Sequence, residues 1–147
     1  MGGFYGLKVA PLAGFSAMVL LCPATEDVVL SAIADSEKGD AGAVTPTDAG
    51  AAPRETNASP RWNTQRLRSY FERQDSRTLA AQVDCPVLLI HAREDEVVPF
   101  NHSLLLTEHM RTETTLLALD GGTHTTAQHD PRVHHYSMAW LAEKLMH

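Results

Sequence analysis

Apolar runs and helical patterns alternate along this chain. Three short apolar runs are typical of buried strands: Phe15–Cys22, Val87–Ile90 and Thr114–Leu119. Apolar residues at helical spacing predict helices around them: Gly2–Ala10, Glu26–Ile33, Arg61–Arg73, Ser76–Gln82, Asn101–Met110 and a last helix that begins at His129-Asp130-Pro131. Strands that alternate with helices of this length indicate parallel βα units, so the sequence predicts an α/β fold.

Breaking and capping residues predict where these helices begin and end. Pro11 is expected to stop the first helix, because proline lacks the N–H that a helix interior needs. The later helices are expected to begin behind polar caps: Thr25, Asn63 or Thr64, Asp75 and Asp130. The last helix has one apolar face that we expect to pack on the sheet: Val133, Tyr136, Trp140, Leu141 and Leu145.

Residues 34–60 break this regular pattern. They consist mostly of Ala, Gly, Asp, Thr, Ser and Pro, and Val44 is their only large aliphatic residue. Such a segment buries too little apolar surface to offset the entropy lost on ordering, so we predict that it is disordered. Trp62, Tyr70 and Phe71 follow it, and the sequence allows them either to line an acyl pocket or to form a helix core.

Composition narrows the function classes. The 147 residues are 44% hydrophobic, enough for one core, and the formal net charge is -6. This charge argues against nucleic acids and anionic membranes as partners, since both require a basic face. The apolar run Val9–Leu21 behind Lys8 resembles a secretory signal, but Leu20 and Leu21 stand where a cleavage site needs small residues.

The two cysteines are too few for a disulfide framework. Cys22 ends one predicted parallel strand and Cys85 precedes another, so they should lie at opposite ends of the sheet, too far apart for a disulfide. We therefore expect both to be reduced, in a cytoplasmic protein.

Candidate chemistry lies just past two of the predicted strands. Asp95 follows the second strand, and His124 follows the third behind Gly121 and Gly122. Sites of open parallel sheets form at the carboxyl ends of the strands, so these two side chains are expected to converge. An acid beside a histidine fixes the tautomer of the ring and stabilises the imidazolium that forms when the ring accepts a proton. Glycines before His124 allow the sharp turn that presents it.

These segments resemble the last two core strands of the α/β-hydrolase superfamily, which contains esterases, lipases and serine peptidases. Asp95 matches the acid of the Gly-x-x-Asp-x-x-Val-Pro loop, with Ala92 in place of the glycine, and His124 matches the histidine of the Gly-Gly-x-His loop. The resemblance implies a partial α/β-hydrolase fold of about three parallel strands. Residues 1–23 would end the nucleophile helix and form the next core strand, residues 24–82 would be a cap or lid, and residues 83–147 would form the C-terminal core.

The same resemblance implies that the nucleophile is missing from this chain. Met1-Gly2-Gly3 matches the end of the Gly-x-Ser-Met-Gly-Gly elbow, which places Met1 at an oxyanion-hole position directly after the serine. Gly2 and Gly3 match the small residues that let the nucleophile helix approach the strand. Ser16 is the internal candidate for a nucleophile, but it enters a strand instead of leaving one and lacks the second glycine of the motif.

Metal and cofactor chemistry receive little support from the sequence. His129, His134 and His135 lie close together, but their spacing matches no ligand motif, so we interpret them as surface or helix-end residues and expect no metal and no cofactor.

Two functions remain open on the sequence alone. The first is a serine hydrolase that cleaves an ester or similar acyl bond of a small molecule, present here as its C-terminal half and inactive by itself. A dehalogenase or peroxidase variant of this fold stays open as well, because the residue that would decide the reaction is not in the chain. The second is a non-catalytic remnant that self-associates through the edge strand Phe15–Cys22.

Overall fold

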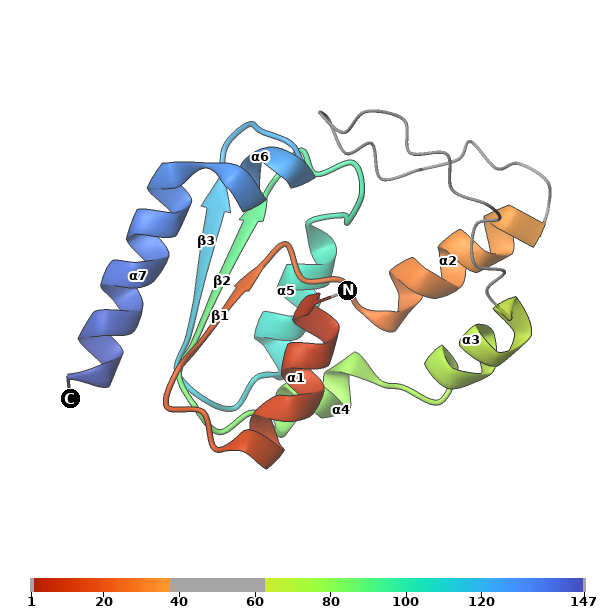
Figure 1. The fold of residues 1–147 in the computed structure, drawn as a ribbon, viewed down its shortest axis with the longest axis horizontal. Helices are drawn as coiled ribbons and strands as arrows, with labels where there is room; N and C mark the ends of the chain where they lie inside the picture. The colour runs from red at the N-terminus through yellow and green to blue at the C-terminus, as the bar shows by residue number, and fades with distance from the viewer. Residues whose placement is uncertain (1, 38–62, 147) are drawn as a thin grey trace, which may run out of the picture.

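Three parallel strands form the centre of the molecule (Figure 1). The computed structural model describes residues 2–37 and 63–146. Strand β1 spans Met18–Leu21, β2 spans Val87–Ala92 and β3 spans Thr114–Leu119, in the order β1-β2-β3. In the register, Met18 lies opposite Val87, which in turn lies opposite Thr114. The central strand β2 is buried along its whole length, as expected for a parallel strand covered on both faces.

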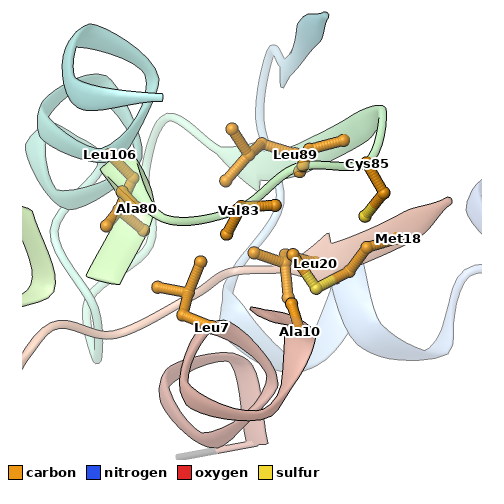
Figure 2. Packing of buried hydrophobic residues seen from close by; sticks show 10 residues of the cluster. Leu7, Ala10, Met18, Leu20, Ala80, Val83, Cys85, Leu89 and Leu106 are labelled. Carbon is orange, nitrogen blue, oxygen red and sulfur yellow. The ribbon is translucent and has the colours of Figure 1, made fainter. Parts of the chain in front are cut away.

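One face of the sheet is covered by three helices. These are α1 (Gly2–Ala13), α4 (Ser76–Ala81) and α5 (Asn101–His109). Figure 2 shows their contribution to the core, in which Leu7, Ala80 and Leu106 lie against sheet residues such as Leu20 and Leu89. Burial of these apolar side chains holds segments together that lie up to about a hundred residues apart in the chain.

The opposite face is covered by α7 (Pro131–Leu145). Val133 and Trp140 pack against Leu88 and Ile90 of β2. Asp130 caps this helix by accepting from the Arg132 N–H, which confirms the predicted start. The predicted packing face is wrong in part: Tyr136 and Leu145 are exposed, whereas Val133, Trp140 and Leu141 pack on the sheet.

Helices α2 (Glu26–Glu37) and α3 (Thr64–Phe71) lie beside each other, away from the sheet (Figure 1). Phe71 is fully buried and its ring lies 5.3 Å from that of Phe4 on α1, so it belongs to a helix core and does not line an acyl pocket. Lys8 of α1 donates to the hydroxyl of Tyr70. Trp62 and most of the segment predicted to be disordered, residues 38–60, lie outside the described residues.

Several predicted boundaries are wrong. Helix α1 continues through Pro11 to Ala13, because Leu7 and Ala10 remain packed on the sheet and only the last turn loses a hydrogen bond. Strand β1 is shorter than predicted, and Phe15 is half exposed. Helix α2 continues through residues 34–37, which were predicted to be disordered. A short helix, α6 (His124–His129), was not predicted at all.

Among the described residues, no helix has the length and apolar character needed to cross a bilayer.

Candidate active site

Asp95 lies in the loop that leaves β2, and its carboxylate is held from two sides. Its Oδ1 accepts hydrogen bonds from the backbone N–H groups of Val97 at 2.9 Å and Val98 at 2.8 Å. The side chain is fully buried. Because the loop itself satisfies Oδ1, the second oxygen, Oδ2, is left to face the loops from the neighbouring strands.

His124 reaches Oδ2 from the loop after β3. Gly121 and Gly122 have φ angles of 78° and 88°, a left-handed conformation that favours glycine and turns the chain sharply. Thr123 then caps α6, and His124 is the first residue of that helix. The His124 Nδ1 lies 2.7 Å from Asp95 Oδ2. Asp95 and His124 therefore lie together in the structure, as their places after neighbouring strands predicted.

The other ring nitrogen of His124 contacts Gln128, one helical turn later. Nε2 lies 2.8 Å from the side-chain amide nitrogen of Gln128. A carboxylate only accepts hydrogen bonds, so Nδ1 carries the proton that goes to Asp95 and Nε2 is the acceptor for the amide. This is the tautomer in which Nε2 is ready to accept a proton. Gln128 occupies the position from which a hydroxyl would approach.

The charge of Asp95 is stabilised by its hydrogen bonds. Burial acts to raise the pKa of this carboxyl, but hydrogen bonds from Val98, His124 and Val97 outweigh burial and hold the pKa below its usual value. Asp95 is therefore ionised near neutral pH and can stabilise a positive charge on His124.

A second histidine supports the acid loop from inside the protein. His91 is fully buried in β2; its Nε2 lies 2.8 Å from the Val98 carbonyl oxygen and 3.3 Å from Asp95 Oδ2. Its Nδ1 lies 2.7 Å from the Ser103 hydroxyl. Burial lowers the pKa of His91 more than Val98 and Asp95 raise it, so the ring is neutral and donates from Nε2. His91 was not predicted as a site residue, because it lies within an apolar run of the sequence.

Cys22 lies beside Asp95 and His124, at the carboxyl end of a third strand, β1. It follows β1 directly, with a φ of 43°, and only 4% of its surface is exposed. Burial raises the pKa of the thiol to about 12; the Ala92 backbone opposes this rise, and the hydrogen bond to Asp95 adds to it. From the sequence, Cys22 was expected only to be a reduced residue at the end of a strand. The rule that carboxyl ends of parallel strands converge could have placed it here.

Other residues singled out from the sequence lie elsewhere. Met1 is outside the described residues, so its oxyanion role stays a prediction. Ser16 precedes β1, and the partners of the His124 ring among the side chains that the structure describes are Asp95 and Gln128, not a serine. His134 contacts the Gln128 carbonyl oxygen at 2.6 Å. Both cysteines are buried and free, with Cys22 at the carboxyl end of the sheet and Cys85 before the start of β2, as predicted.

The sequence profile of the prolyl oligopeptidase family, a peptidase family, matches residues 47–147. The chain belongs to the prolyl oligopeptidase family. The match contains both Asp95 and His124, which lie in contact in the structure. A search of curated protein sequences finds no significant match.

Solved structures agree with this family membership at the level of the fold. Est1E from Butyrivibrio proteoclasticus, solved with ferulic acid, is similar with a TM-score of 0.66 and 19% identity, over 99% of this chain and 57% of that one. One chain from a structural study of LipS and LipT, two metagenome-derived lipolytic enzymes, is similar with a TM-score of 0.60 and 22% identity, over 100% of this chain and 62% of that one. An acylaminoacyl peptidase from Pyrococcus horikoshii is similar with a TM-score of 0.56 and 16% identity, over 98% of this chain and 22% of that one.

These similarities establish a partial α/β-hydrolase fold, as the sequence predicted. The family member described here spans less than two thirds of each of these solved chains.

Proposed function

We propose that this protein contributes the acid and the histidine of a Ser-His-Asp triad to the hydrolysis of an ester or similar acyl bond in a small molecule. The hydrogen bond between Asp95 Oδ2 and His124 Nδ1 carries this proposal, since it joins an ionised acid to the ring in the tautomer that the reaction needs. Membership of a hydrolase family adds independent support.

The roles follow from the two ring nitrogens. A serine hydroxyl from outside the described residues takes the place of the Gln128 amide at Nε2 and gives its proton to that nitrogen when it attacks the acyl carbon. Asp95 stabilises the imidazolium, and His124 then returns the proton to the leaving group. We also propose that this chain is inactive by itself, because none of its residues matches the serine of the Gly-x-Ser-Met-Gly-Gly elbow. Its two free, buried cysteines favour the reducing cytoplasm.

A fluorophosphonate probe, which labels activated serines, tests this proposal. We expect no labelling of the chain alone, and labelling of a longer product in which Gly-x-Ser directly precedes Met1. In the longer product, Asp95→Asn is expected to reduce turnover by about four orders of magnitude, because the neutral amide cannot stabilise the imidazolium and its NH2 group favours the wrong tautomer of the ring. His124→Ala is expected to abolish labelling, with the exposed His135→Ala as the matched control. Full labelling of the His124→Ala product would contradict the proposed roles.

A second candidate function is self-association through β1. This strand lies at an edge of the described sheet, where parallel strands expose unpaired backbone groups. Large apolar side chains are exposed on α1 and just before β1: Tyr5, Val9, Leu12 and Phe15. This role needs no nucleophile.

A further inference from the structure

The carboxyl ends of all three strands bring one possible metal ligand each to the same point. Cys22 follows β1, Asp95 follows β2 and His124 follows β3. One ligand atom from each of these side chains lies within 4.8 Å of those of the other two. The group joins a thiol, a carboxylate and an imidazole.

We propose that Cys22, Asp95 and His124 form a binding site for a zinc-like divalent cation. Thiolate sulfur, imidazole nitrogen and carboxylate oxygen are the ligands that zinc uses, and three protein ligands leave a fourth position for water. The His124 side chain is 20% exposed, whereas that of Asp95 is fully buried, so the ring side of the group opens to solvent. An ion can therefore enter past His124.

Contacts with neighbouring residues already orient two of the three proposed ligands, Asp95 and His124. The Val97 and Val98 N–H groups hold Asp95 Oδ1, while Oδ2 accepts from His124 Nδ1 and lies 3.3 Å from His91 Nε2, so Oδ2 can bind an ion once the proton leaves Nδ1. Gln128 contacts His124 Nε2, and rotation of its amide would turn an oxygen toward that nitrogen. His124 could then bind the ion through Nδ1 and donate from Nε2 to Gln128, an outer contact of the kind that metal-bound histidines make.

Small movements are sufficient to reach metal geometry. Tetrahedral zinc with bonds of about 2.0 to 2.3 Å places its ligand atoms about 3.3 to 3.8 Å apart. Asp95 Oδ2 and His124 Nδ1 are 2.7 Å apart and would separate slightly as the proton between them leaves Nδ1 for Nε2. The atoms now up to 4.8 Å apart would close by about 1 Å. The thiol proton is released to solvent.

This site has a consequence for catalysis that rests on the proposed function. The ion replaces the proton that joins Asp95 to His124 and leaves Nε2 protonated, so the metal-bound form cannot accept a proton from serine. The proposed site therefore cannot bind the metal and support hydrolysis at the same time, because both use Asp95 and His124.

Metal titration of the chain itself tests the site without any activity measurement. We expect one Zn²⁺ per chain by calorimetry, and a thiolate-to-metal charge-transfer band when Co²⁺ is used instead. Cys22→Ser is expected to lose the band and to bind Zn²⁺ at least about tenfold more weakly. Cys85→Ser is the matched control, because Cys85 is also buried and free but lies in the core beside α1, and it should bind as the wild type does.

His124→Ala gives a second test that does not alter the buried strand end. It is expected to weaken Zn²⁺ binding as well, whereas His135→Ala should not. A Co²⁺ complex without the charge-transfer band, or equal affinities for wild type, Cys22→Ser and His124→Ala, would overturn the site. Because the readout is the metal, its failure leaves the triad proposal standing, and failure of the fluorophosphonate test leaves the metal site standing.

Discussion

At the scale of single residues, His102 shows how one side chain connects two elements: it joins α5 to the loop after β1. Its Nδ1 lies 2.8 Å from the hydroxyl of Thr25, which is fully buried. Burial lowers the pKa of His102, and His91 adds to this effect, while the charges of Asp27 and Glu26 oppose it. Thr25, which was predicted to cap the following helix, directly precedes α2, and its hydroxyl is paired with this ring.

The lowered pKa of His102 predicts how stability depends on pH. The unfolded chain protonates this histidine near pH 6.5 and the folded chain only at lower pH, so the unfolded state binds more protons in between. Stability should therefore fall as the pH decreases below about 6.5. Urea unfolding at several pH values measures this, and the fall should be smaller in His102→Asn.

Thr25→Val is the control for the pH experiment. It removes the hydrogen bond but keeps the titrating ring, so it should lower the free energy of unfolding and retain the dependence on pH. Burial also lowers the pKa of His91, so part of the dependence should remain in His102→Asn. Identical pH profiles for wild type and His102→Asn would contradict this interpretation.

At the scale of elements, the approach of α1 to the end of β1 depends on Gly3. A Cβ atom at Gly3 would lie 2.8 Å from Pro23 Cβ and 3.0 Å from its Cα. A Cβ at Gly2 would meet nothing within 4 Å. Of the two glycines that the resemblance singled out, Gly3 alone makes the close approach to the chain after β1.

Gly3→Ala is therefore expected to destabilise the protein by about 1 to 3 kcal/mol, because the helix or Pro23 must move. Gly2→Ala is the matched control: it adds the same methyl group to the same helix in open space and should be neutral or slightly stabilising. Chemical denaturation of both variants measures the difference. Equal stabilities would show that the approach of α1 to Pro23 is not tight.

At the scale of the whole molecule, the proposed self-association depends on the outer edge of β1. The N–H groups of Met18 and Cys22 donate to Pro86 and Ile90 on the β2 side. Because N–H groups alternate in direction along a strand, those of Val19 and Leu21 face away from β2.

Val19→Pro removes one outward donor and leaves the β2 ladder intact. If β1 mediates self-association, this variant should raise the dissociation constant of the dimer about tenfold. Val19→Thr is the control, since it keeps both the N–H and the branched shape. Sedimentation over a range of concentrations measures the effect. A wild-type chain that stays monomeric, or a dimer unaffected by the proline, would contradict this second candidate function.

Much of the architecture could be predicted from local signals. Strand β3 has the predicted bounds, and Asn63, Asp75 and Asp130 cap their helices as expected. Helix α6 was missed because its polar sequence has no apolar period and its first turn depends on the Thr123 cap and on contact with the sheet. Gln128 was missed with it, since its contact with His124 exists only when both lie on one helix.

The sequence by itself determined the fold class and the two strand exits that carry Asp95 and His124. Apolar periodicity and turn residues are local properties, and parallel strands necessarily bring their carboxyl ends together. Only the tertiary structure decided which oxygen of Asp95 meets which nitrogen of His124, and that the Cys22 thiol joins them. Those contacts span 29 residues between Asp95 and His124, and more from Cys22, and they depend on side-chain rotamers and backbone angles that no local pattern specifies.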